Sequence, residues 1–186
     1  VLLGRNSPNP KADFVAADDI MVGELAVRHL VEKGYDKILF INARQSYSAQ
    51  LRAEGFLSAV KAHQSRIKKH WIKVVPGKED VERTLREAAR QGLDFNAIFC
   101  FNDDIAIEVI RYLKSCKLRI PDDVGVIGVD NLDFSAILSP PLTTIDIHKH
   151  EIGIRAAEVL LRRMEDRDCP IQQVILSPKL VERGST

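Results

Sequence analysis

Cysteine is scarce in this 186-residue sequence, which has three, Cys100, Cys116 and Cys169. An odd number of cysteines at wide, irregular spacings fits neither a disulfide framework nor a zinc site. Unpaired thiols favour a reducing compartment. We therefore expect a cytoplasmic protein with no bound metal and no cofactor.

The sequence also lacks long apolar runs and an excess of either charge. No run approaches the roughly 20 residues that a membrane-spanning helix needs, so we expect no membrane partner. The 27 Lys and Arg residues balance 26 Asp and Glu, for a net charge of +1, which provides no general field for a polyanion. With 45% hydrophobic and 28% charged residues, the composition excludes disordered, collagen-like and disulfide-scaffold proteins.

The motifs of common enzyme classes are absent as well. There is no phosphate-binding GxxxxGK[ST] motif and no Gly-x-Ser-x-Gly elbow around a serine nucleophile. Gly125 and Gly128 lie within a predicted strand, where they cannot hold a pyrophosphate. His148 and His150 are two residues apart and point to different faces of a helix, which disfavours joint metal ligation. We expect a protein that is not an enzyme and has no catalytic residues.

The sequence does contain a regular alternation of strand and helix patterns. Apolar positions repeat every three or four residues in the helical segments, and the strands are apolar on both faces. This order predicts an α/β fold with a doubly wound parallel sheet flanked by helices. The predicted strands are Ile38 to Ile41, Trp71 to Val75, Ala97 to Phe101, Val124 to Val129 and Val174 to Leu176. Ser139-Pro140-Pro141 ends the alternation, and the short run that follows, Leu142 to Ile145, could cross to a second subdomain.

Polar residues follow the predicted strands, at the sheet edge where parallel α/β proteins bind ligands. Together they offer hydrogen-bonding groups suited to a polyhydroxylated small molecule. Arg52 lies one helical turn after Ser48, so its guanidinium can reach the same edge. The edge residues are Asn42, Arg44, Ser46 and Ser48, then Gly77 and Lys78, then Asn102, Asp103 and Asp104, then Asp130 and Asn131.

Most of these residues also have a structural interpretation. Ligand contact is favoured for Asn102 and Asp130, whereas Asp103 and Asp104 also suit the capping of a helix. The two serines, Ser46 and Ser48, suit a loop or a helix N-cap equally well. Arg52 and Lys78 could instead be surface residues that contact no ligand. Arg52 would then pair with Glu54 or Glu82, and Lys78 would be a solvated loop lysine.

Several stretches, in their order along the chain, resemble one protein family. They are Leu30-Val-Glu-Lys-Gly-Tyr35, Arg52-Ala-Glu-Gly-Phe56, Phe101-Asn-Asp-Asp104, Val124-Gly-Val-Ile-Gly-Val-Asp130-Asn131, Leu138-Ser-Pro-Pro-Leu-Thr-Thr-Ile145 and Leu180-Val-Glu-Arg-Gly-Ser-Thr186. Together they resemble the C-terminal, effector-binding region of the lactose-repressor/galactose-repressor (LacI/GalR) family of bacterial transcription regulators.

The resemblance implies a periplasmic-binding-protein-like fragment of a two-subdomain effector domain. Residues 1–17 and 148–176 would belong to the N-terminal subdomain, and residues 18–147 and 177–186 to the C-terminal one. A small effector would bind between the subdomains and control allosterically how a homodimer binds operator DNA. That DNA would be bound by an N-terminal helix-turn-helix that these 186 residues do not include. The alternative is a periplasmic solute-binding receptor of the same fold.

Family ligand contacts transfer to Ser46, Ser48, Arg52, Asn102 and Asp130 of this sequence. Many members place an aromatic ring where this sequence has Gly77 or Lys78. We expect Lys78 to contact the ligand, and with Arg5 and Arg52 it indicates an anionic sugar acid or phosphate as one option beside a neutral sugar. The resemblance also places Phe134, Ile137 and Leu138 near the dimer interface; burial in a packed loop is the alternative.

Overall fold

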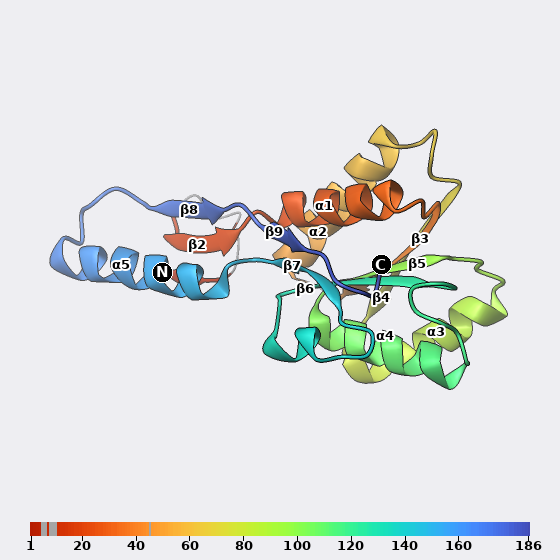
Figure 1. Cartoon of the computed structure of the whole chain (residues 1–186). Helices are drawn as coiled ribbons and strands as arrows, with labels where there is room; N and C mark the ends of the chain where they lie inside the picture. Colours follow the sequence, from red (N-terminus) through yellow and green to blue (C-terminus); the bar gives the residue numbers. More distant parts are fainter. Residues whose placement is uncertain (5–6, 8–10, 45) are drawn as a thin grey trace.

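The computed structural model describes residues 1–4, 7, 11–44 and 46–186, and these form two lobes, each built on its own sheet (Figure 1). In the small lobe, a three-stranded sheet of order β1-β2-β8 packs against helix α5. Its elements are β1 (Leu2–Leu3), β2 (Phe14–Ala17), α5 (Lys149–Glu165) and β8 (Gln173–Leu176).

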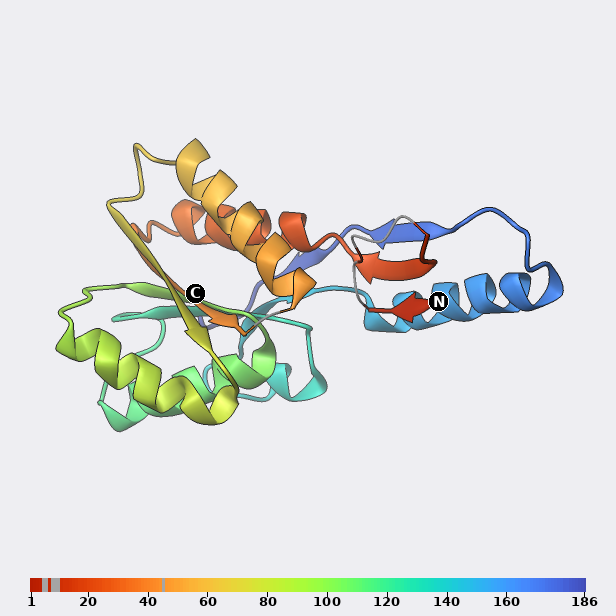
Figure 2. The same cartoon turned by 180° about the vertical axis from the view of Figure 1, so that it is seen from behind.

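The large lobe has a six-stranded sheet of order β4-β3-β5-β6-β7-β9 with helices on both faces (Figures 1 and 2). Its strands are β3 (Lys37–Ala43), β4 (Lys69–Val75), β5 (Ala97–Cys100), β6 (Gly125–Val129), β7 (Thr143–Asp146) and β9 (Lys179–Val181). Its helices are α1 (Asp19–Glu32), α2 (Tyr47–Ala62), α3 (Val81–Arg90) and α4 (Asp103–Ser115), with short 3-10 turns η1 (Lys78–Asp80) and η2 (Asp133–Ala136).

Burial on both faces explains the continuous apolar strands of the large sheet. Helices α1 and α2 cover one face around Phe40, Phe56 and Phe99, while α3 and α4 cover the other around Leu39 and Ile98. Strands β3 to β7 are parallel, as predicted, but β9 pairs antiparallel with β7. The predicted α/β fold is therefore confirmed, with an antiparallel edge strand added. None of the helices in the described ranges is long and apolar enough to cross a membrane.

Two glycines allow α1 and α2 to approach closely. A Cβ atom at Gly55 would overlap the carbonyl oxygen of Ile20, and one at Gly23 would overlap the carbonyl oxygen of Arg52. Both obstacles are backbone atoms, which cannot move aside as a flexible side chain can. The close contact of these two helices therefore depends on glycine at both positions, and it sets the position of Arg52 on α2.

We expect Gly55→Ala to destabilise the large lobe by about 1 to 3 kcal/mol, the usual cost of overpacking. The added methyl group would force α2 away from α1. Urea denaturation of the variant should show a lower midpoint. Gly153→Ala is the matched control, because a Cβ at that helical glycine meets nothing within 4 Å. Equal midpoints for the two variants would contradict this account of the helix contact.

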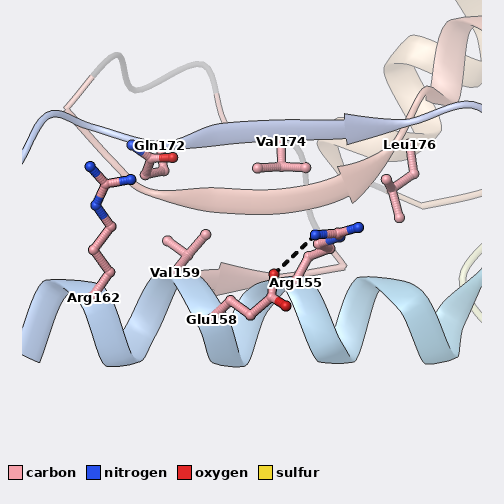
Figure 3. A pocket seen from close by; sticks show the side chains of 7 residues that line it. All are labelled: Arg155, Glu158, Val159, Arg162, Gln172, Val174 and Leu176. Carbon is pink, nitrogen blue, oxygen red and sulfur yellow. Dashed lines mark hydrogen bonds and ion pairs between the residues drawn. The ribbon is translucent and has the colours of Figure 1, made fainter.

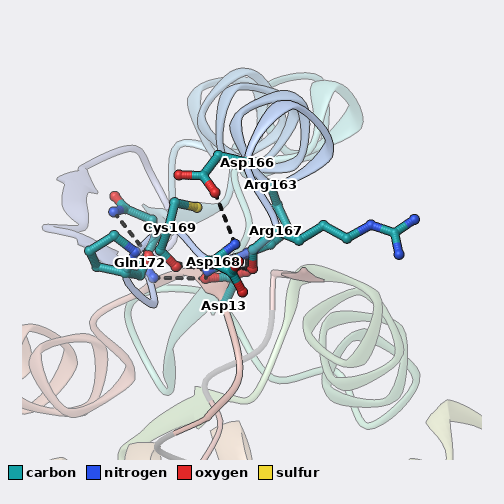
Figure 4. A network of polar contacts seen from close by, with 8 residues as sticks. Asp13, Arg163, Asp166, Arg167, Asp168, Cys169 and Gln172 are labelled. Atoms are coloured by element: carbon teal, nitrogen blue, oxygen red, sulfur yellow. Dashed lines mark hydrogen bonds and ion pairs between the residues drawn. The ribbon is translucent and has the colours of Figure 1, made fainter.

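In the small lobe, Arg163 at the end of α5 is hydrogen-bonded to the segments that precede β2 and β8. The Arg163 guanidinium donates to both carboxylate oxygens of Asp13 at 3.0 Å and to the carbonyl oxygens of Arg167 and Cys169 (Figure 4). The Asp13 carboxylate also accepts from the Gln172 amide, and the Arg163 hydrogen bond holds the pKa of Asp13 below its usual value. The end of α5 is thereby fixed to the start of β2 and β8.

Between α5 and β8 lies a mostly apolar groove of about 450 Å³ (Figure 3). Val159, Val174 and Leu176 provide its apolar lining, and an Arg155–Glu158 ion pair lies at its side. None of the sequence-predicted site residues lines this groove.

Three chain segments connect the two lobes. They lead from β2 into α1, from β7 into α5 and from β8 into β9 (Figure 1). A hydrogen bond of 2.9 Å from the Asp18 amide to the Leu176 carbonyl joins two of them. Because β2 and β8 run toward the large lobe and β7 runs toward the small lobe, the carboxyl edges of the two sheets face each other. The candidate site lies at this junction.

Candidate functional site

Arg52 is buried at the carboxyl edge of the large sheet, with 5% of its surface exposed. Its Nε donates to Asp19 Oδ1 at 2.8 Å, and its Nη1 donates to the Phe101 carbonyl oxygen at 2.5 Å. The guanidinium also lies over the Phe101 ring, 4.3 Å from the ring centroid. The proposed surface pair with Glu54 or Glu82 is thus wrong: the partner is Asp19, itself 3% exposed.

Asp130 follows β6 and presents a carboxylate at this edge. Its amide donates to the Ile145 carbonyl at 2.9 Å, and its φ of 110° lies in the left-handed region. Within the described part of the chain, the half-buried carboxylate has no hydrogen-bond partner, and its oxygens are open to solvent, since no fully buried side-chain oxygen lacks a partner. Burial raises its pKa to about 6, although the nearby positive charges of Arg52 and Lys149 act in the opposite direction. The Asp130 carboxylate can therefore accept hydrogen bonds from a ligand, and it lies near Arg52, which is already paired with Asp19.

Asn102 and Asp103 are adjacent in sequence but have different structural roles. Asn102 is the N-cap of α4 and accepts from the Ile105 amide at 3.0 Å. Asp103 is fully buried and accepts from Ser135, from Thr144 and from the Leu132 amide. Burial raises the pKa of Asp103, and these hydrogen bonds act against the rise. Asp103 therefore neither caps α4 nor faces a ligand; it fixes the loop that carries Asp130.

The two serines lie at the start of α2. Ser46 is the N-cap and accepts from the Ala49 amide at 3.0 Å, while Ser48 is half-buried in the first turn. Asn42 is buried, and its side chain donates to the Ala49 carbonyl at 2.9 Å. A hollow of about 470 Å³ opens beside these residues, lined by Asn42, Ala43, Arg44, Ser46, Ala49, Gln50, Ala53, Ile72 and Val74. The capping interpretation of Ser46 is confirmed; its ligand contact stays a prediction.

Lys78 does not join the other predicted ligand contacts in the described structure. It begins η1 after β4, is exposed, and does not line the hollow beside Asn42 and Ser46. Arg5, the other basic residue behind the anionic option, lies outside the described residues. Within the described ranges, no three His, Cys, Asp or Glu side chains gather closely enough to hold a metal ion.

A second hollow, of about 340 Å³, adjoins Asp130 at the β7–α5 connection. It is polar, and residues from both lobes line it: Asp130, Asn131, Asp146, His148, Lys149, His150 and Glu151. Asp130 and Asn131 were expected at this edge from the sequence, but Asp146 was not. Asp146 is the last residue of β7, and the order of the strands brings it next to them.

The three residues expected at a dimer interface lie on or beside η2. Phe134 and Leu138 are half-buried, and Leu138 packs against the core beneath α4. Ile137 is 83% exposed, more than any other large apolar side chain among the described residues. Packing within the loop therefore describes Phe134 and Leu138, whereas contact with a partner stays a prediction for all three residues.

Comparison with known proteins agrees with this architecture. A family profile described as periplasmic binding protein-like domain matches residues 27–186. The repressor PurR of Photobacterium profundum is 32% identical over 190 residues, covering 100% of this chain and 56% of the relative. The ribose operon repressor of Escherichia coli is 32% identical over 183 residues, covering 94% of this chain and 53% of the relative. The chain spans about half the length of these curated relatives.

Solved structures show the same arrangement. A LacI family regulator from Enterococcus faecalis with bound ribose has a TM-score of 0.87 at 29% identity, over 97% of this chain and 66% of its own. A protein from Alkaliphilus metalliredigens complexed with D-xylulofuranose has a TM-score of 0.86 at 28% identity, over 98% and 68%. The chain therefore belongs to the periplasmic binding protein-like domain family and is an effector-binding region of the LacI/GalR type.

Proposed function

We propose that this chain is the effector-sensing part of a bacterial DNA-binding transcription regulator. The single observation that carries the proposal is the unpaired Asp130 carboxylate beside the buried Arg52–Asp19 pair, at the junction of two lobes. Relatives named as transcriptional repressors support a regulator over a periplasmic solute receptor. They also support a role in ligand sensing rather than in catalysis, and hence a cytoplasmic location beside DNA.

The chemistry of the edge favours a neutral, hydroxyl-bearing ligand such as a sugar. A carboxylate without partners accepts hydroxyl hydrogens, and such charge-assisted bonds are among the stronger ones in proteins. The Arg52 charge is already balanced by Asp19, so it offers little to an anion. Two similar structures contain ribose or D-xylulofuranose, in line with a sugar for this chain. Sugar acids and phosphates remain the second candidates.

Control of DNA binding would follow from a shift between lobe orientations. A ligand that contacts both carboxyl edges binds one orientation better than the other and raises its population. We propose that a helix-turn-helix elsewhere in the whole protein senses that orientation and binds operator DNA as part of a homodimer.

The homodimer can be tested at its exposed apolar residue. We expect Ile137→Asp to weaken self-association of the full-length protein, because a charge would replace an apolar side chain in the buried contact. Sedimentation velocity over a range of concentrations measures the change. Ile154→Asp on α5 is the matched control, being another exposed isoleucine, 42% exposed. A homodimer unchanged by Ile137→Asp would exclude this surface as its interface.

The ligand class can be tested by thermal unfolding of the full-length protein against a panel of pentoses, hexoses, sugar acids, sugar phosphates and purines. A ligand at 100 times its Kd stabilises the folded state by about 2.7 kcal/mol, enough to raise the melting temperature clearly. We expect the largest rise from an uncharged sugar, and the same sugar should alter binding to operator DNA. A response confined to purines or to anions would contradict the neutral-sugar proposal.

A further inference from the structure

Left-handed backbone conformations gather around the hollow beside Asp130. Among the described residues other than glycine, four have a positive φ: Lys117, Asp130, Asn131 and His148. Three of these line the hollow. Such conformations are strained for residues other than glycine and persist only where surrounding contacts hold them, often at functional sites. The contacts at Asn131 and His148 show what holds them here.

The Asn131 side chain is fixed at both ends. Its Nδ2 donates to Asp146 Oδ2 at 3.1 Å, and its Oδ1 accepts from Arg183 Nη2 at 2.7 Å. Its amide donates to Thr144 Oγ1 at 3.3 Å. Arg183 is itself held, because its Nη1 donates to the Leu142 carbonyl oxygen at 2.7 Å. The residue next to Asp130 is thereby tied to β7.

Asp146 links Asn131 to the start of the small-lobe helix α5. It is the last residue of β7, and its second oxygen, Oδ1, accepts from the His148 amide at 2.7 Å. His148 has a φ of 57° and is the N-cap of α5, although its side chain makes no capping hydrogen bond. One carboxylate thus joins the loop after β6 to the N-cap residue of the small-lobe helix.

We propose that Asn131 and Asp146 are positioning residues that couple the loop carrying Asp130 to the direction in which α5 leaves the large lobe. The proposal rests on the proposed function, since it gives a route by which a ligand at Asp130 reorients the lobes. A movement of Asp130 displaces Asn131, which adjoins it in sequence. The displacement then reaches the His148 amide through the two oxygens of Asp146.

The chain provides a convenient labelling pair for a test. Cys116, at the end of α4 in the large lobe, is exposed, whereas Cys100 and Cys169 are buried. Met164 on α5 is 70% exposed, so Met164→Cys adds a second site in the small lobe. Spin labels at these positions in the full chain report the distance between the lobes by pulsed electron resonance, with no sugar present.

We expect one narrow distance distribution for the parent protein and a broader or shifted one for Asn131→Ala and for Asp146→Ala. Asn131→Asp is the milder variant should alanine impair folding: it keeps the Arg183 contact but sets a carboxylate against Asp146. Asp122→Ala, an exposed aspartate outside the network, should leave the distribution unchanged. Parent-like distributions for Asn131→Asp and Asp146→Ala would overturn the proposal. Because no sugar is used, a failure of sugar binding cannot be mistaken for a failure of the coupling.

Discussion

Replacing Asp130 with asparagine is expected to weaken effector binding about 10- to 100-fold, the range that corresponds to a charged hydrogen bond of roughly 1.5 to 3 kcal/mol. The carboxylate has no partner in the described chain, so its acceptors are available to ligand hydroxyls. An amide of the same shape keeps one acceptor and turns the other into a donor. Calorimetric titration of the parent and the variant with the same sugar measures the loss.

The same substitution is expected to stabilise the protein without ligand at pH 7. The folded-state pKa of Asp130, about 6, lies above its ordinary value of 3.8, so the folded protein holds this proton more tightly. Its contribution to stability is complete below pH 4 and is lost as the pH rises through 6. The asparagine side chain does not titrate, so the variant should gain about 1 to 2 kcal/mol at pH 7, allowing for partial exposure of the group.

Denaturation from pH 4 to pH 8 separates the two effects. The parent should lose stability relative to Asp130→Asn across that window, and the exposed control Asp122→Asn should follow the parent. A variant that binds sugar normally would remove Asp130 from the site. A variant that binds poorly but shows no relative gain in stability would instead contradict the description of a half-buried, unpaired carboxylate with a raised pKa.

Replacing Arg52 with methionine is expected to destabilise the large lobe by about 3 to 5 kcal/mol, the usual effect of removing one partner of a buried ion pair. The side chains of Arg52 and Asp19 are 6% and 4% exposed, so the substitution would break a buried ion pair and leave the Asp19 carboxylate in the core. The Phe101 carbonyl would lose a donor as well. Urea denaturation measures the change, and it should exceed that caused by Gly55→Ala.

A double variant tests the reason for the loss. Adding Asp19→Asn to Arg52→Met removes the buried carboxylate charge as well and should recover part of the stability. Arg86→Met is the matched control, since Arg86 pairs with Glu82 on the exposed surface of α3 and such pairs contribute little. If Arg52→Met costs no more than Arg86→Met, the arginine is not a structural element of the site.

Local patterns were sufficient to predict much of the fold. The strands β3 to β6 follow from their continuous apolar runs, and the helices between them from apolar positions spaced three or four residues apart. The Val174 to Leu176 run also predicted β8, although that strand is short and partly exposed. β2 has only four residues, Phe14–Ala17, and β9 has three, Lys179–Val181, which is too short for a distinct pattern. Their places depend on pairing with strands far along the chain, which no local pattern encodes.

In the candidate site, too, some features follow from local sequence and others depend on residues far apart in the chain. The rule that ligands bind beyond strand ends was sufficient to place Arg52, Asn102 and Asp130 at one edge. It did not predict Asp19 as the partner of Arg52, because the two lie 33 residues apart and meet only through the close packing of α1 and α2. Asp103 also looked like a helix cap in sequence, and only its burial among side chains from η2 and β7 shows its structural role.

The most direct measurement of the central claim is hydrogen–deuterium exchange of the full-length protein with and without the sugar that stabilises it most. If the effector binds at the carboxyl edge of the large sheet, exchange should slow in the start of α2, in the turn after β5 and in the loop after β6. Those segments carry Ser46 to Arg52, Asn102 and Asp130. Protection confined to other segments, with these three unchanged, would contradict the claim.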